Sequence, residues 1–321
     1  MRFLVTGASG FIGRPLCMAL AEAGHTVRAA TRGTPLEAFE TVVTGEIDGN
    51  TDWRGALAGI DVIVHLAARV HVMQEHAIDP LAAYMAANAE GTRTLAEQAA
   101  QAGVRRFVLV SSVKVNGEAT APGQAWREDD APAPLDPYGV SKLHAEQSLR
   151  DVAARTGMEA VIVRPPLVYG PGVGANFARL MRLVDKGYPL PFGAIRNRRS
   201  MVYVGNLVDA LMTCALHPAA ANETFFVADE PPLSTGELVV ALASAQGKPN
   251  RLFTLPTCIL AAAGRLTGQR EAIRRLTESL VISSDKIRTT LDWQPPYSMN
   301  AGLVATADAR TERRSSPGSR A

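Results

Sequence analysis

The chain has 321 residues, of which 47% are hydrophobic and 20% charged, and its formal net charge at pH 7 is +2. This composition predicts a globular protein of one large or two modest domains and gives no electrostatic case for a nucleic-acid partner. The three scattered cysteines favour buried thiols in a reducing compartment, and although His65, His71 and His76 lie close together, no ligand spacing indicates a metal site.

The first thirteen residues, MRFLVTGASGFIG, predict a strand, a glycine turn and the start of a helix. Glycines permit a tight turn and the close approach of a pyrophosphate, and a helix N-terminus favours negative charge. The spacing is GxxGxxG instead of the usual GxGxxG, and a turn that merely packs a helix on a strand would carry similar glycines. Because an apolar strand stands directly before them, we favour a dinucleotide site. Its expected cofactor-binding residues are Gly7, Ser9, Gly10, Phe11, Ile12 and Gly13.

The second predicted strand, residues 25–31, ends without an acidic residue. In nucleotide-binding units an Asp or Glu at this point binds both ribose hydroxyls and selects NAD, whereas a nearby Arg accommodates a 2′-phosphate. The sequence therefore favours NADP(H), with NAD(H) as the alternative, unless Arg32 is only a solvated loop residue. A third strand is expected over 39–47, near which an adenine would rest. The residues expected at the adenosine end of the cofactor are Thr31, Arg32, Glu46 and Ile47.

Further along the chain, apolar strands at 61–68 and 106–111 alternate with long helices at 80–102 and from 136 onward. This alternation predicts an α/β fold with a doubly wound parallel sheet covered by helices on both faces. Ligands of such sheets bind beyond the carboxyl ends of the strands. Cofactor contacts are therefore expected there from Leu66, Ala67, Ala68, Asn88, Ser111 and Pro165.

Tyr138 and Lys142 lie four residues apart, so both project from one face of the predicted helix. Alone, this spacing is common on protein surfaces, but Ser112 follows the strand at 106–111 on the same sheet edge. The ordinary pKa of tyrosine, near 10, makes it a poor acid–base catalyst at neutral pH. An ammonium one turn away and the charge of an oxidised nicotinamide would lower that pKa. Ser112 would donate to the carbonyl oxygen on which charge develops during hydride transfer.

Beyond residue 172 the pattern changes to helical segments separated by short strand-like pieces. We expect residues 1–172 to form the dinucleotide-binding domain and 173–304 a smaller, mixed C-terminal substrate-binding region with an interleaved boundary. The Arg- and Ser-rich residues 305–321 are expected to be a disordered tail. The N-terminus lacks the features of a signal peptide, and no run approaches the ~20 apolar residues of a membrane span, so we expect a cytoplasmic protein.

The motifs GASGFIG, HLAA, VSS, YGVSK and RPPLVYGPG, in this order, resemble the extended short-chain dehydrogenase/reductase family of nucleotide-sugar epimerases, dehydratases and reductases. The resemblance implies a Rossmann fold in which Ser112, Tyr138 and Lys142 are catalytic. Tyr138 and Lys142 would also contact the cofactor. Family members often form homodimers through two long helices, which here are residues 80–102 and 137–155.

The resemblance also suggests contacts to a UDP-sugar substrate. The segment NRRSMVYVGNLVDA implies that Arg199 meets the substrate diphosphate, and GANFARLM nominates Asn176, although a surface charge and a helix cap are the plainer interpretations. Ser112 and Lys114 would face the sugar, and Lys114 stands where many epimerases and dehydratases have Thr. Val113-Lys114 replaces the Asp-Glu pair of family 4,6-dehydratases, which argues against dehydration.

A finer resemblance concerns AARVHVM, SSVKVNGE and LDWQPPYS, which look like segments of bacterial UDP-2-acetamido-2,6-dideoxy-hexos-4-ulose reductases. Those enzymes make UDP-N-acetylquinovosamine or its C4 epimer for O-antigen. The prediction is therefore NAD(P)H-dependent reduction of a C4 ketone. The main rival is a UDP-hexose 4-epimerase with tightly held NAD. A remote rival is a non-catalytic NADP(H)-binding regulator, against which the intact Tyr138 and Lys142 count.

Overall fold

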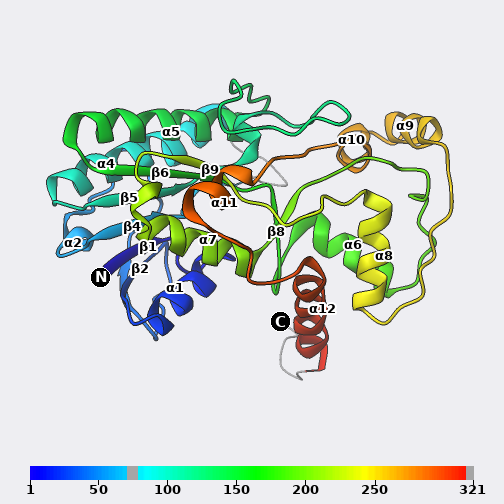
Figure 1. Ribbon diagram of the computed structural model, residues 1–321, viewed down its shortest axis with the longest axis horizontal. Coiled ribbons are helices and arrows are strands. Elements are labelled where there is room, and N and C mark those ends of the chain that lie inside the picture. The colour runs from blue at the N-terminus through cyan, green and yellow to red at the C-terminus, as the bar shows by residue number, and fades with distance from the viewer. Residues whose placement is uncertain (71–78, 316–321) are drawn as a thin grey trace.

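In this computed structural model, which describes residues 1–70 and 79–315, seven parallel strands form one sheet in the order β3-β2-β1-β4-β5-β6-β9 (Figure 1). The strands are β1 Arg2–Thr6, β2 Thr26–Thr31, β3 Glu40–Val43, β4 Val62–His65, β5 Arg106–Val110, β6 Glu159–Arg164 and β9 Thr224–Phe226. The chain runs outward from β1 in one direction, through β2 and β3, and then from β4 in the other. Such a reversal of strand order creates a crevice beyond the carboxyl ends of β1 and β4, where ligands bind in open α/β sheets.

Helices cover both faces of this sheet because its strands are apolar on both sides. Phe3 and Val5 of β1 pack with α1 (Gly13–Glu22) and α7 (Val204–Leu216), whereas Leu4 points to the other face. That second face is covered by α2 (Arg54–Leu57), α4 (Gly91–Gln101) and α5 (Pro137–Thr156), as Figure 1 shows. The predicted doubly wound α/β fold is confirmed.

The predicted helix at 80–102 is continuous but not uniform. It consists of α3 (Pro80–Tyr84), a π-helical turn at Met85–Glu90, and α4. A π-helical turn is rare and often marks a functional site. Here it contains Asn88.

The chain beyond residue 172 contributes to two bodies. Helix α7 and strand β9 belong to the main sheet, since β9 pairs with β6 in parallel. The rest forms a smaller region with its own core, which includes Phe177, Met181 and Leu242. Together with β7 Leu167–Tyr169, its elements are β8 Met201–Tyr203, α6 Ala175–Asp185, α8 Thr235–Ala245, α9 Thr257–Leu266, α10 Arg270–Thr277 and α12 Met299–Ser315. Helix α11 Asp285–Leu291 instead packs into the main core through Ile287 and Leu291.

The prediction of a disordered tail from residue 305 is wrong for most of that stretch. Helix α12 extends to Ser315, and Leu303 and Ala307, one helical turn apart, are buried in the core of the smaller region. The polar, Arg-rich composition of this segment concealed its apolar face. Residues 316–321 lie outside the described residues, as do His71 and His76 and the end of the AARVHVM motif.

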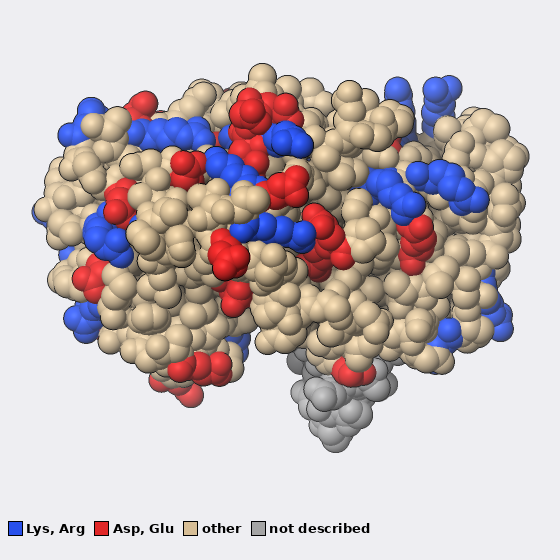
Figure 2. Space-filling model, in the orientation of Figure 1, with Lys and Arg blue, Asp and Glu red and all other residues tan. Residues whose placement is uncertain are grey.

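The surface shown in Figure 2 is mixed in charge. On the face shown in Figure 2, acidic and basic side chains are interspersed over the main sheet and its helices. Within residues 1–70 and 79–315, we find no helix whose length and apolarity would let it cross a bilayer.

Candidate active site

The glycine turn between β1 and α1 packs closely against itself and against the end of β4. Gly7 has a φ of +65°, and a Cβ added there would lie 2.9 Å from the backbone nitrogen of Ala67. A Cβ on Gly13 would lie only 2.2 Å from the carbonyl oxygen of Gly7. Among the described residues, no side chain caps the N-terminus of α1, and its first turn contains no acidic residue. The Arg14 amide donates to the Gly10 carbonyl at 3.1 Å and Pro15 has no N–H, so the amides placed to meet an anion are those of residues 11–13.

A buried hydrogen-bond chain fixes the neighbouring end of β4. The Thr6 hydroxyl accepts from the amide of Ala67 (3.1 Å) and lies 2.7 Å from His65 Nδ1. His65 Nε2 lies 3.1 Å from the Thr92 hydroxyl. Burial, and then the charge of Lys142, lower the pKa of His65 to about 3, so this imidazole is neutral. The chain holds the backbone at Leu66–Ala68 against the glycine turn, where the sequence predicts cofactor contacts.

Asn88 connects this segment to helix α5. Its Nδ2 donates to the Ser141 hydroxyl (2.9 Å) and to the Arg69 carbonyl (3.0 Å), and its Oδ1 accepts from the Arg69 amide (2.7 Å). The side chain expected to contact cofactor is thus turned toward the protein and ties the loop after β4 to the helix that carries Tyr138.

The residues expected at the adenosine end lie together at the ends of β2 and β3. Thr31 is buried, and Arg32 Nη1 forms an exposed ion pair with Glu46 Oε1 at 3.3 Å. Ile47 packs next to Gly91, where an added Cβ would lie 2.7 Å from Ile47 Cγ2.

These features fit a dinucleotide. Within the described part of the chain, the buried hydroxyls of Thr31 and Ser111 have no hydrogen-bond partner, and both lie at strand ends on the ligand-binding edge. At the glycine turn, the backbone lies too close to itself and to the end of β4 for a Cβ at Gly7 or Gly13, so bare backbone stands at the switch point. The amide of Val113 bonds to the Pro165 carbonyl at 3.0 Å, which fixes the strand end next to Ser111.

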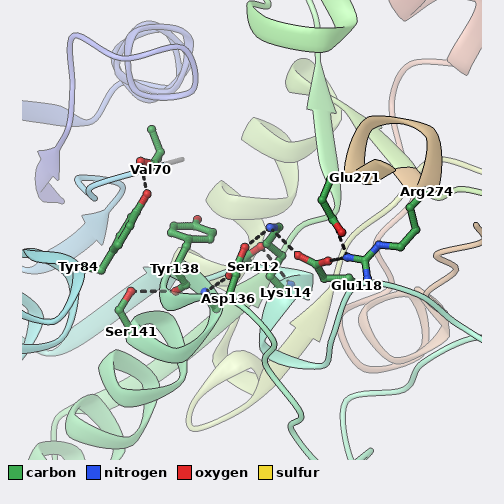
Figure 3. Close-up of polar contacts among 11 residues, drawn as sticks. Val70, Tyr84, Ser112, Lys114, Glu118, Asp136, Tyr138, Ser141, Glu271 and Arg274 are labelled. Atoms are coloured by element: carbon green, nitrogen blue, oxygen red, sulfur yellow. Dashed lines mark hydrogen bonds and ion pairs between the residues drawn. The ribbon is translucent and has the colours of Figure 1, made fainter. Parts of the chain in front are cut away.

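Helix α5 begins where the sequence places its catalytic residues. Asp136 is the N-cap, with its Oδ1 accepting from the Gly139 amide at 2.7 Å, and Pro137 occupies the first turn. Tyr138 therefore lies in the first turn and Lys142 in the second. Ser112 lies beside the Tyr138 side chain at the start of α5 (Figure 3), and Lys142 is buried one turn further along the same helix.

The electrostatics of this pair differ from the expectation. Burial, together with the charge of Asp136 and the nearby Tyr84, raises the pKa of Tyr138 to about 12, although the bond to Ser112 lowers it. Burial also lowers the pKa of Lys142 to about 8. Desolvation of the phenol therefore dominates in the protein alone, and the expected lowering of this pKa, which also involves the charge of an oxidised nicotinamide, stays a prediction.

The predicted substrate residues differ in their surroundings. Arg199 is largely buried, and burial, followed by the charge of Arg275 on α10, lowers the pKa of its guanidinium. The charges of Glu278 and Glu118 act on Arg199 in the opposite direction, and its Nη1 donates to the Glu278 carbonyl at 3.1 Å. Asn176 is exposed in the first turn of α6, whose N-cap is Gly174.

Arg275 was not singled out from the sequence, and the only signal there is the basic run REAIRRL. Lys114, expected to contact substrate, instead forms ion pairs with Glu118 (3.2 Å) and Asp136.

A glycine turn at the switch point of a parallel sheet, with a Ser–Tyr pair and a buried Lys on the same edge, defines a Rossmann-type nucleotide-dependent oxidoreductase. Residues 3–228 match the NAD dependent epimerase/dehydratase family, and the chain belongs to that family. It is an NAD-dependent enzyme of the short-chain dehydrogenase/reductase type.

Individual relatives cover nearly the whole chain. It is 43% identical to a UDP-glucose 4-epimerase of Vibrio cholerae, over 95% of this chain and 94% of that protein. The UDP-glucuronic acid 4-epimerase of Bacillus cereus, in complex with UDP-glucuronic acid and NAD, shares the fold with a TM-score of 0.78 at 24% identity, covering 98% of this chain and 100% of its own. MoeE5 in complex with UDP-glucuronic acid and NAD matches with a TM-score of 0.76 at 26% identity, over 98% and 100% of the two chains.

Proposed function

We propose that this chain transfers hydride at C4 of a UDP-sugar and that its net reaction is the 4-epimerisation of a UDP-hexose, such as UDP-glucose or UDP-N-acetylglucosamine. The observation that carries the proposal is the Ser112–Tyr138 pair at the sheet edge beside the glycine turn. The 43% identity to a UDP-glucose 4-epimerase favours epimerisation over the reductase expected from the sequence motifs.

Three side chains carry the proton chemistry. Tyr138 Oη takes the proton of the sugar 4-hydroxyl as C4 is oxidised and returns it to O4 when C4 is reduced from the other face. Ser112 donates to the same oxygen, where negative charge develops. The bound dinucleotide supplies hydride acceptance and return. Because burial raises the pKa of Tyr138 to about 12, its phenolate needs the positive charge of Lys142 and of the oxidised nicotinamide.

Substrate recognition would use the smaller region. Arg199 and Arg275 would bind the diphosphate, since their mutual repulsion is relieved by an anion between them. Asn176, exposed at the start of α6, would hydrogen-bond the same group. Ser112 would meet the sugar itself.

A second candidate is the reduction of a UDP-2-acetamido-2,6-dideoxy-hexos-4-ulose. The end of β2 favours it, because Thr31 and Arg32 stand where an acid would select tightly bound NAD, and an exchangeable NADPH suits a reductase. The exposed pair between Arg32 and Glu46 weakens this argument, since Glu46 would oppose a 2′-phosphate.

The two candidates separate in one assay. One sample of the purified protein is denatured to release any bound nicotinamide. A second, native sample is incubated with UDP-glucose or UDP-N-acetylglucosamine without added cofactor. Interconversion of the C4 epimers supports the epimerase. Consumption of added NADPH by the 4-keto sugar, without epimerisation, supports the reductase. If neither occurs, both proposals are refuted.

We further propose that the protein is a homodimer formed through α3–α4 and α5, which lie side by side on one face of the sheet (Figure 1). Light scattering after size exclusion tests this, and a monomeric mass at micromolar concentration would contradict it. The cytoplasmic location expected from the sequence stays a prediction.

A further inference from the structure

Lys114 is held inside the protein instead of pointing freely toward a ligand. It lies in the short 3-10 turn Val113–Val115 that directly follows Ser112. Its side chain is 26% exposed, and its ammonium pairs with Glu118 at 3.2 Å and with Asp136. Both partners are acidic, so the lysine neutralises charge at this point.

Asp136 is the residue through which Lys114 reaches the catalytic helix. One of its carboxylate oxygens accepts from the Gly139 amide at the start of α5, and the other receives the ammonium of Lys114. The contact is close on the backbone side as well, since a Cβ on Gly139 would lie 2.7 Å from the Lys114 carbonyl oxygen. The turn after Ser112 and the first turn of α5, which contains Tyr138, are thus packed and charge-paired to each other.

The same charges continue toward the smaller region. Glu118 also pairs with Arg274 of α10, which in turn contacts Glu271 at 2.9 Å on its own helix. Figure 3 shows these side chains in a row from α10 to the N-terminus of α5. Arg274 is adjacent in sequence to Arg275, whose charge acts on the buried Arg199.

We propose that Lys114 is a positioning residue for Tyr138, acting through Asp136, and that Glu118 and Arg274 couple this contact to the diphosphate site formed with α10. The inference rests on the proposed function in that it takes Tyr138 as the acid–base group. It gives Lys114 a role other than the substrate contact expected from the sequence.

The charges around Tyr138 determine the sign of the effect. Asp136 acts on it from the N-cap of α5, Tyr84 packs against it from α3, Ser112 lies beside it, and Lys142 is one turn further along α5. The Asp136 carboxylate raises the pKa of Tyr138, and the Lys114 ammonium offsets that carboxylate. Removing the ammonium therefore disfavours the phenolate, which oxidation of the sugar alcohol requires.

The first test compares Lys114→Met with Lys114→Arg and with a control, Lys248→Met, which removes a lysine paired to Asp185 at 3.8 Å away from the site. For Lys114→Met we expect kcat to fall roughly tenfold to a hundredfold through misplacement of Tyr138. The pH midpoint of kcat should rise by on the order of 0.5 unit, with little change in KM. Lys114→Arg should restore both. A higher KM with unchanged kcat and pH profile would identify a substrate contact and overturn the proposal.

A second variant should shift the pH midpoint of kcat in the opposite direction. Asp136→Asn keeps a capping oxygen for Gly139 but removes the negative charge, so the pH midpoint of kcat should fall. An upward shift in this variant would contradict the assigned electrostatics, and this test remains usable if Lys114→Met folds poorly.

A third measurement does not depend on any substrate. Hydrogen exchange of the peptide containing Gly139 is followed in the protein without sugar, and Lys114→Met should exchange faster than Lys248→Met. Equal exchange in the two variants would refute the positioning role even if no UDP-sugar is ever turned over. Conversely, an inactive wild type refutes only the proposed function. The contact between Glu118 and Arg274 is tested separately. Arg274→Met should raise KM for the UDP-sugar at least severalfold relative to Arg270→Met on the same helix, and equal KM values would refute the coupling.

Discussion

Replacing Gly13 by alanine should weaken both the fold and the cofactor site. The added Cβ would lie 2.2 Å from the Gly7 carbonyl oxygen and 2.8 Å from the Ala8 Cα, and both neighbours are backbone. Ordinary contact begins near 3.4 Å, so the turn and α1 must separate by about 1 Å. Such overpacking costs about 1–3 kcal/mol. Alanine returns up to about 1 kcal/mol as a better helix former, which leaves a net loss of up to about 3 kcal/mol.

The assay for Gly13→Ala is urea unfolding combined with a titration of NAD(H). We expect a lower midpoint and at least a roughly tenfold weaker affinity, because the amides that would bind the pyrophosphate move by about 1 Å relative to α1. Gly55→Ala is the matched control, since among the described residues nothing lies within 4 Å of its added Cβ. It should be neutral or stabilising by up to about 1 kcal/mol. Equal stability and cofactor affinity in the two variants would refute the packing argument.

Three other predictions concern groups already described or buried in the core. Tyr138→Phe should lower turnover of the UDP-sugar by roughly 10²–10⁴-fold and leave cofactor affinity within about twofold; a nearly normal rate would remove Tyr138 from its role. Glu146→Gln leaves the buried Arg164, bonded to it at 2.8 and 2.6 Å, without its counter-charge. It should cost about 3–5 kcal/mol in urea unfolding, against less than about 1 kcal/mol for the exposed Glu223→Gln. Because burial lowers the pKa of His65 from 6.5 to about 3, its neutral form stabilises the fold fully above pH 6.5. That contribution is lost as pH falls toward 3, by about 1.4 kcal/mol per unit, and His65→Gln should flatten this part of the stability profile.

The strands of the main sheet before residue 172 could be predicted because their signals are local, whereas β9 lies in the stretch 173–304 that the sequence assigned to the substrate-binding region. Each strand is a short apolar run bounded by turn residues, and the alternation with helices determines a parallel sheet without knowledge of any distant contact. The catalytic helix was predictable for the same reason, since Asp136 and Pro137 mark its start and the spacing of Tyr138 and Lys142 fixes their common face. The helix at residues 305–315 was missed because its buried residues Thr306 and Ala307 stand within a polar, Arg-rich segment.

What the sequence could not supply is the set of interactions between distant parts of the chain. Glu118 and Arg274 are 156 positions apart, so nothing in the local pattern pairs them, and Lys114 taken alone suits substrate binding as well as structure. Likewise, the sequence does not distinguish Arg275 from the other arginines of α10, and only the fold places its charge near Arg199. The pKa of Tyr138 depends on the same kind of information, because the surrounding fold desolvates the phenol and raises its pKa, which no spacing rule contains. Residue spacing therefore identifies which groups take part in the chemistry, whereas their protonation and coupling are properties of the assembled charges around them.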